Sequence, residues 1–212
     1  MCSSDLNIET FHMNEGHCSF LTLELLREYN DERCVREKCH FTTHTPVAAG
    51  HDHFSLERVK NLLHDLIPEN FNLPSLVQNS RLHMTELGLH FSRSANGVSA
   101  LHGQVAQKQF PQVQIGHITN GVYHPYWICP QFRELFDDFL PGWRRDGEKL
   151  LNVDSIPNEK LLMAHAKRKR SLLGYANAQV QKALSRQVVT IGFARRAATY
   201  KRAHLLFSDM DR

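Results

Sequence analysis

The chain has 212 residues, of which 42% are hydrophobic and 22% charged. This composition is typical of an ordinary globular protein and excludes a disordered tail. The formal net charge of +3 is too small to indicate nucleic acid or a membrane surface as a partner, and no stretch of about 18 apolar residues occurs. The length predicts one large domain or two small ones.

The cysteines argue against a secreted, disulfide-stabilised protein. The chain has five of them: Cys2, Cys18, Cys34, Cys39 and Cys129. They form neither an even set nor a CxxC pair, which excludes a disulfide framework and a cysteine-rich zinc module. The N-terminus has neither the basic region nor the apolar core of a signal peptide, so we expect a reducing, cytoplasmic location. Residues 1–6, "MCSSDL", show no periodicity and are interpreted as a junction outside the fold.

The first half of the chain alternates between strand and helix patterns. Residues 12–17 predict a strand-to-helix corner, and "SFLTLELLREY" (19–29) an amphipathic helix. A strand is expected to end at Thr43, in a loop containing Pro46 and Gly50. "SLERVKNLLHDLI" (55–67) predicts a helix that begins after an N-cap at Ser55 and stops at Pro68.

The next segments continue this alternation. "MTELGLHFSRS" (84–94) predicts a helix, and "ANGVSALHGQVAQKQF" (95–110) a short buried strand, a tight turn and a further helix. Asn14, Asn96 and Asn120 are each expected at a turn. Asn96-Gly97 and Asn120-Gly121 are interpreted first as turn formers, because Asn and Gly tolerate a positive φ.

Residues 126–186 are expected to be mostly helical, with residues 144–159 as an internal loop. "QVVTIGFA" (187–194) then predicts a buried strand and "YKRAHLLF" (200–207) a helix. Strands alternating with helices indicate an α/β fold with a parallel sheet. Because the chain stops one helix after its last expected strand, we expect a domain to be cut off at the C-terminus.

Four cationic side chains are clustered at the expected junction between that last strand and its helix: Arg195, Arg196, Lys201 and Arg202. Guanidinium and ammonium groups at a helix N-terminus suit phosphate. A solvated basic helix start explains the charges equally well, so position alone leaves both interpretations open. The run "KRKR" (167–170) lies within a helical pattern and is interpreted as a solvated face.

Histidines are unusually frequent, with 14 in the chain, and six of them crowd one region: His12, His17, His40, His44, His51 and His53. No spacing fits a zinc template such as HExxH, so no metal site is predicted. Histidines in loops after strands also serve as hydrogen-bond donors to hydroxyl-rich ligands, and some are simply satisfied structural groups.

Five segments, in this order, resemble the α-glucan (glycogen/maltodextrin) phosphorylase family in its shorter bacterial and archaeal form. They are "HMNEGHCSFLTLE", "FTTHTPVAAGHDHF", "NGVSALHGQV", "ITNGVYHPYW" and "IGFARRAATYKRAHLLF". The resemblance implies part of a two-lobe GT-B-type glycosyltransferase fold of paired Rossmann-like domains. It also implies transfer of a glucosyl unit from an α-1,4-glucan to orthophosphate, with retention, and pyridoxal phosphate as the cofactor whose phosphate group relays the proton.

The resemblance also implies roles for individual residues. Arg196 and Lys201 match the pair that holds the substrate phosphate, and His44 the histidine beside the reacting carbon. The sugar-binding positions correspond to Asn14, Glu15, His17 and Asn120. No lysine here matches the one that forms the Schiff base with the cofactor, which is expected beyond Arg212. Three positions depart from the family pattern: Ala197 replaces an aromatic residue, the histidine of "YHPYW" is shifted by one place, and His53 replaces an arginine.

The resemblance therefore predicts an internal fragment, inactive alone, of a phosphorylase with possible homo-oligomers at full length. Residues 7–121 are expected to be the C-terminal part of the N-terminal lobe, 122–186 a helical inter-lobe segment, and 187–212 the first strand and helix of the C-terminal lobe. Two alternatives stay open. A nucleotide-sugar glucosyltransferase of the same fold also needs an Arg and a Lys near phosphate, and a non-catalytic glucan-binding fragment needs neither.

Overall fold

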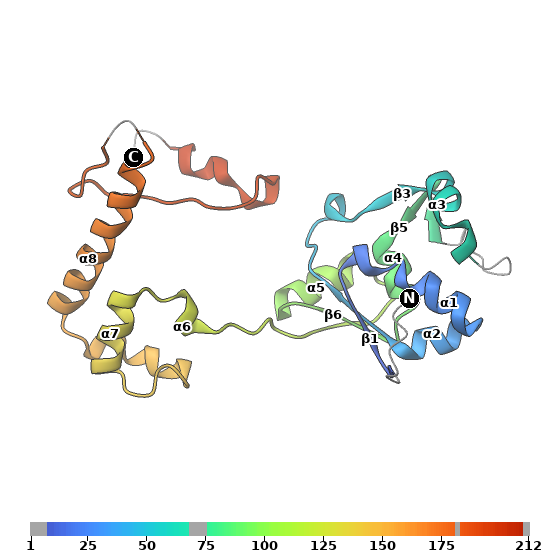
Figure 1. Cartoon of the computed structure of the whole chain (residues 1–212), viewed down its shortest axis with the longest axis horizontal. Coiled ribbons are helices and arrows are strands. Elements are labelled where there is room, and N and C mark those ends of the chain that lie inside the picture. Colours follow the sequence, from blue (N-terminus) through green and yellow to red (C-terminus); the bar gives the residue numbers. More distant parts are fainter. Residues whose placement is uncertain (1–7, 68–75, 181–182, 210–212) are drawn as a thin grey trace. The chain divides into compact units, whose positions relative to one another are not determined.

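A computed structural model describes residues 8–67, 76–180 and 183–209 of the chain (Figure 1). The chain divides into two compact units, Met1–Asn120 and Gly121–Arg212, which we describe separately. In the described parts, no helix is both long and apolar enough to cross a membrane. The predicted lobe boundaries concern a larger fold and stay predictions.

The first unit is built on a four-stranded parallel sheet. Its strand order is β1-β2-β6-β7, which follows the order of these strands along the chain: β1 (Phe11–Asn14), β2 (Cys39–Thr43), β6 (Ser94–Gly97) and β7 (Ile115–His117). Helices lie in the connections between these strands: α1 (Leu21–Tyr29), α2 (Glu32–Lys38), α3 (Leu56–Leu63), α4 (Met84–His90) and α5 (Ala100–Gln109). The prediction of an α/β fold with a parallel sheet is confirmed.

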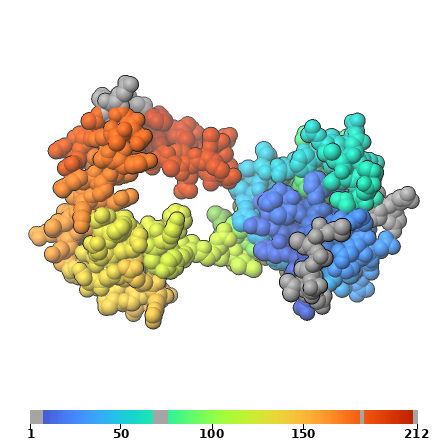
Figure 2. Space-filling view, viewed as in Figure 1, coloured from blue at the N-terminus to red at the C-terminus, as the bar shows by residue number. Residues whose placement is uncertain are grey.

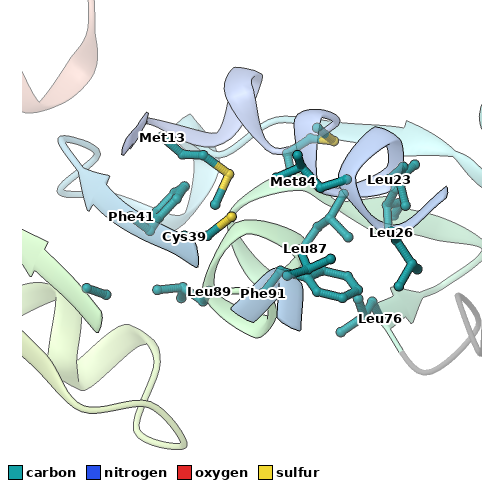
Figure 3. Close-up of a cluster of buried hydrophobic side chains, with 14 of the residues drawn as sticks. Met13, Leu23, Leu26, Cys39, Phe41, Leu76, Met84, Leu87, Leu89 and Phe91 are labelled. Atoms are coloured by element: carbon teal, nitrogen blue, oxygen red, sulfur yellow. The ribbon is translucent and has the colours of Figure 1, made fainter. Parts of the chain in front are cut away.

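One face of the sheet carries the hydrophobic core of the first unit. Because side chains alternate along a strand, every second residue points to this face, as Met13, Cys39 and Phe41 do. They pack with Leu23, Leu26, Leu87 and other residues of the helices in one cluster, shown in Figure 3. Right-handed crossovers place the connecting helices of a sequentially ordered sheet on one face, which explains why the core is one-sided.

The opposite face of the sheet is polar. His12 Nε2 lies 2.7 Å from Thr42 Oγ1, which donates a hydrogen bond to Asn96 Oδ1 at 2.9 Å. His40 Nε2 also lies 2.7 Å from Asn96 Oδ1, and His40 Nδ1 lies 2.7 Å from Ser94 Oγ. Since Thr42 and Asn96 are buried, these contacts satisfy groups that would otherwise destabilise the sheet.

A second, smaller sheet follows β2. Its strands are antiparallel, in the order β3-β5-β4: β3 (His53–Ser55), β4 (Val77–Gln78) and β5 (Arg81–His83). Asn79 and Ser80 connect β4 to β5, and both have a positive φ, as a two-residue hairpin turn requires. This hairpin has no signal in the sequence, because strands of two or three residues are too short to show a period.

The helices of the first unit agree with the sequence pattern. Ser55 caps α3 as predicted, with its hydroxyl accepting from the backbone N–H of Arg58 at 3.3 Å. The predicted stop at Pro68 lies outside the described residues. The predicted turn at Asn96-Gly97 is wrong, because both residues lie in β6 and neither has a positive φ. Asn120-Gly121 is not a turn either, but part of a segment without helix, strand or turn.

The second unit is a small helical assembly. It contains α6 (His124–Trp127), α7 (Pro130–Phe139), the 3-10 segment η5 (Gly147–Ser155) and α8 (Asn158–Asn177). The prediction of a mostly helical segment is confirmed, although η5 occupies the stretch expected to be a loop. Trp143 is almost fully buried in the hydrophobic cluster to which α7 and α8 both contribute, and its Nε1 donates to Asp137 Oδ1 at 2.9 Å. Asp137 also accepts two bonds from Arg144, which with Trp143 lower the pKa of its carboxyl to about 2.

The predicted buried strand at 187–194 is wrong in this structure. Residues 187–198 form neither helix nor strand, and Val189 and Ile191 are 82% and 74% exposed. The predicted helix at 200–207 is replaced by two short 3-10 segments, η6 (Thr199–Lys201) and η7 (Ala203–Phe207). Figure 2 shows this part of the chain, at the red end of the colour bar, as an arm that projects away from the orange helix α8. A strand needs neighbours for its backbone hydrogen bonds, and the described residues supply none here.

Three histidines meet beside the ring of Phe110, the residue that follows α5. His83, at the end of β5, is buried and lies 4.2 Å from His53 and 5.4 Å from His51, measured between ring centroids. His51 Nδ1 is 2.8 Å from Thr85 Oγ1, and its Nε2 is 2.8 Å from Gln109 Oε1. Burial and, to a lesser extent, the two neighbouring histidines lower the pKa of His83 from 6.5 to about 4.

The low pKa of His83 predicts that the first unit loses stability in acid. Between about pH 6.5 and pH 4 the unfolded chain binds a proton at His83 that the folded chain does not bind. The free energy of unfolding should therefore fall by up to about 3 kcal/mol as the pH drops through this window. Urea unfolding at pH 7, 6, 5 and 4, followed through NMR signals of first-unit residues, measures this loss.

His83→Asn is the matched variant for this prediction. Its amide oxygen can still accept the Glu86 backbone N–H that His83 Nδ1 accepts at 3.4 Å, but the side chain no longer titrates. We expect a lower stability at pH 7 and a smaller loss between pH 6.5 and 4. Burial raises the pKa of Glu86, so protonation of this carboxyl increases the free energy of unfolding as the pH falls, opposite to the effect of His83. An unchanged pH dependence in His83→Asn would contradict the assignment to His83.

Candidate functional site

The four parallel strands end at one edge of the sheet. Their last residues are Asn14, Thr43, Gly97 and His117, for β1, β2, β6 and β7 respectively. In open α/β sheets, ligands bind outside the carboxyl ends of the strands, where backbone groups and loop side chains converge. We therefore take this edge as the candidate site of the first unit.

Glu15 fixes the geometry of the edge. Its backbone has φ 76° and ψ 166°, a region that only glycine adopts without strain. Its carboxylate holds this conformation: Oε1 accepts from the N–H of Gly16 at 3.1 Å, and Oε2 accepts from the N–H of His44 at 2.7 Å and from Thr45 Oγ1 at 2.8 Å. Glu15 therefore joins the end of β1 to the loop after β2.

The residues on either side of Glu15 are arranged around it. Gly16 is buried, and a Cβ there would lie 3.3 Å from Met84 Cβ and from Thr85 Oγ1, so the turn packs closely on α4. His17 lies in the following 3-10 helix, η1 (Gly16–Cys18). Asn14 and His17 are exposed, which leaves both side chains accessible to a ligand.

His102 organises the end of β6, a role that the sequence pattern did not predict. Its Nδ1 accepts a hydrogen bond from the backbone N–H of Val98 at 3.2 Å. A Cβ on Gly97 would lie only 2.7 Å from this nitrogen, which explains the glycine at the strand end. The backbone N–H of Asn120 donates to Val98 carbonyl at 3.1 Å, so Asn120 is attached to the same strand end. A histidine in the first turn of a helix that follows a glycine was the only available signal.

The structure thus brings together several of the predicted sugar-site residues. Glu15 and His44 are in direct contact, Asn14 and His17 flank Glu15 in the chain, and Asn120 lies beside the end of β6. The side chains of His44 and Asn120 are exposed. In the described ranges, no group of three or more His, Cys, Asp or Glu residues is placed to hold a metal ion.

The predicted phosphate-site residues belong to the second unit. Arg196 Nη2 donates to the Tyr200 hydroxyl at 3.4 Å, and Lys201 Nζ lies 4.6 Å from the centre of the Tyr200 ring. Lys201 first, and Arg196 to a smaller extent, lower the pKa of the Tyr200 hydroxyl. The structure therefore brings the two cations together around one tyrosine.

The expected setting of these cations is wrong. Arg195 and Arg196 do not follow a strand, and Lys201 ends the three-residue η6 instead of starting an α-helix. Arg202 has φ 58° and is exposed. The cluster is thus held by side-chain contacts and not by a strand-to-helix junction.

The parallel sheet and its polar carboxyl edge place the first unit among the α/β proteins whose ligands bind at strand ends. No family model matches the chain. It is 34% identical to glycogen phosphorylase of Mycobacterium tuberculosis (strain H37Rv), over 96% of this chain and 29% of that protein. It is 31% identical to maltodextrin phosphorylase of Thermococcus litoralis, over 95% of this chain and 28% of that protein.

The resemblance to the α-glucan phosphorylase family is confirmed: the chain is homologous to part of these proteins over nearly all of its own length. It spans about 29% of the length of the M. tuberculosis relative. The aligned stretch of 253 residues is longer than the chain itself, so this relative carries additional residues within the matching region.

Two substitutions at Glu15 should distinguish the stabilising effect of its carboxylate from the destabilising effect of its strained backbone. Glu15→Ala removes the acceptor of three hydrogen bonds and is expected to lower the free energy of unfolding of the first unit by about 2 kcal/mol. Glu15→Gly removes the same acceptor but relieves the strain, so it should be more stable than Glu15→Ala by about 1 kcal/mol. In both variants, hydrogen exchange at the His44 amide should become faster.

Glu28→Ala is the control for this pair, because Glu28 is an exposed residue of α1. It is expected to change the unfolding free energy by less than about 0.5 kcal/mol and to leave exchange at His44 unchanged. Equal stability of Glu15→Ala and Glu15→Gly would show that the backbone of residue 15 is not strained.

Proposed function

We propose that this chain is part of an α-glucan phosphorylase. The reaction transfers the glucosyl unit at the non-reducing end of an α-1,4-glucan to orthophosphate and yields α-glucose 1-phosphate with retention. Homology over nearly the whole chain to proteins named glycogen phosphorylase and maltodextrin phosphorylase carries this proposal. The distribution of polar and charged groups in the two units supports it.

The carboxyl edge of the first unit suits a neutral, hydroxyl-rich ligand. The segments that follow its four strands contain no Arg or Lys: residues 15–19, 44–52, 98–102 and 118–120. They carry instead the amide, imidazole and carboxylate groups that donate to and accept from sugar hydroxyls. In the proposed site, His44 contacts the glucosyl unit beside the reacting carbon, and further hydroxyls are bound by Asn14, Glu15, His17 and Asn120.

The cation cluster of the second unit suits orthophosphate. The guanidinium of Arg196 can bind two phosphate oxygens in a bidentate manner, and the ammonium of Lys201 adds a second positive charge. Tyr200 contacts both groups. In the proposed reaction, Arg196 and Lys201 orient the attacking phosphate and stabilise the charge that develops during transfer.

The resemblance to phosphorylases also implies pyridoxal phosphate, but the described residues do not form a site for it. Lys201 is partly exposed and packs on Tyr200, and none of the described lysines lies in a glycine-rich turn that would cradle a phosphate. We therefore derive no step of the reaction through this group. The free thiols of Cys18, Cys34, Cys39 and Cys129 fit the proposed cytoplasmic location, since a reducing compartment keeps thiols free.

The proposal predicts an activity for a longer protein. Extended at both ends to the length of its relatives, the chain is expected to release glucose 1-phosphate from maltodextrin when orthophosphate and pyridoxal phosphate are present. Arg196→Ala and Lys201→Ala should each lower the rate by roughly 100-fold, because each removes a cation that stabilises the transferring group. An enzyme-coupled assay of glucose 1-phosphate measures both effects.

Arg170→Ala is the matched control, because Arg170 is an exposed cation of α8 outside the proposed site. It should leave the rate unchanged. Turnover of ADP-glucose or UDP-glucose without glucose 1-phosphate release would instead identify a nucleotide-sugar glucosyltransferase. Glucan binding that survives Arg196→Ala and Lys201→Ala, with no turnover of either kind, would identify a glucan-binding fragment.

A further inference from the structure

One ring nitrogen at the carboxyl edge is buried without a partner. His102 is 8% exposed, and its Nε2 forms no hydrogen bond with any described residue. Buried polar groups are nearly always hydrogen-bonded, and leaving one unpaired is costly. The exception at His102 therefore needs an explanation.

The other ring nitrogen fixes the chemical character of Nε2. His102 Nδ1 accepts a hydrogen bond from the Val98 backbone N–H, so it carries no proton. A neutral imidazole then carries its proton on Nε2, which makes this atom a donor that lacks an acceptor. The missing group must be an oxygen or another acceptor.

The location of His102 relates this donor to the proposed sugar site. The Val98 carbonyl accepts a hydrogen bond from the backbone N–H of Asn120, and the Val98 N–H donates one to His102 Nδ1. In the sheet, Gly97 is paired with Thr43, so the residues that follow them, Val98 and His44, leave neighbouring strand ends. His102 is thus attached to the strand end that lies between two of the proposed sugar-binding residues.

The charges around this edge determine the kind of acceptor. No Arg or Lys is present in the four segments that follow the strands, whereas Glu15 places a carboxylate among them. An anion such as phosphate is therefore disfavoured here, while a neutral hydroxyl oxygen is not. His102 keeps 8% of its surface exposed, although Nε2 itself is buried.

We infer that His102 is a further substrate-binding residue: its Nε2–H donates a hydrogen bond to a hydroxyl oxygen of the α-1,4-glucan. This inference rests on the proposed function. His102 has two separate tasks, since Nδ1 holds the end of β6 and Nε2 binds the sugar. The two tasks can be separated, because an Asn amide reaches the position of Nδ1 and a Gln amide that of Nε2.

The test compares two variants of the 212-residue chain. His102→Asn keeps an acceptor for the Val98 N–H but loses the donor, and it should weaken binding of maltotetraose about ten-fold with little effect on stability. His102→Gln keeps a donor near Nε2 but loses the acceptor, so it should bind maltotetraose better than His102→Asn while being the less stable of the two. NMR titration gives the affinities, and urea unfolding gives the stabilities.

If the role of His102 is purely structural, the more stable of the two variants should also bind maltotetraose more tightly. That result would overturn the inference. A second measurement needs no variant. In the ¹⁵N-histidine-labelled chain, the Nε2–H signal of His102 should shift on addition of maltotetraose, and neither cellotetraose nor inorganic phosphate should shift it. A signal that phosphate shifts, or that maltotetraose leaves unchanged, also overturns the inference.

His44→Ala distinguishes failure of the inference from failure of the proposed function. If the unchanged chain binds maltotetraose, and His44→Ala weakens this binding while His102→Asn does not, only the role of His102 is wrong. If the unchanged chain binds no maltotetraose, the proposed sugar site is wrong and the role of His102 fails with it.

Discussion

The strained backbone of Glu15, and the carboxylate that holds it, fix the carboxyl edge of the first unit. Strain of about 1–3 kcal/mol persists only where surrounding contacts impose it, and such residues cluster at functional sites. Here the contacts are the hydrogen bonds from Gly16, His44 and Thr45. They join the end of β1 to the loop after β2, so that Asn14 and His44 leave the sheet with a defined spacing.

The strand order determines what surrounds this edge. Because the four strands follow one another in sequence order, their connecting helices contribute to one core, and the opposite face keeps a polar network around Thr42 and Asn96. All four strand ends reach the same edge, and the segments that follow them contain no Arg or Lys. The proposed phosphate ligands belong to the other unit. The proposed reaction, between a neutral sugar and an anion, therefore has its two kinds of binding group on separate units.

The sequence was sufficient to predict the parts of the fold that rest on long periodic patterns or on a motif. The parallel α/β fold and most helices follow from alternating strand and helix signals, and the cap at Ser55 follows from its position before an apolar pattern. Asn96-Gly97 was mistaken for a turn because local preference favours a positive φ, whereas pairing of β6 with both neighbours imposes an extended backbone. The role of His102 was missed because its one sequence signal, a histidine in the first turn of a helix that follows a glycine, does not show that a ring nitrogen is buried and unpaired.

Residues 187–198 show where a local pattern is insufficient. The run "VVTIGF" has the composition of a buried strand, yet a strand of a parallel sheet is stable only when neighbours pair with its backbone and cover both of its faces. Among the described residues, no backbone group pairs with this run. The Val188 carbonyl accepts a hydrogen bond from a side chain instead, the ammonium group of Lys169. Arg196 and Lys201 are nevertheless brought together by Tyr200. The grouping of the two cations thus depends on local side-chain contacts with Tyr200 and not on a strand-to-helix junction.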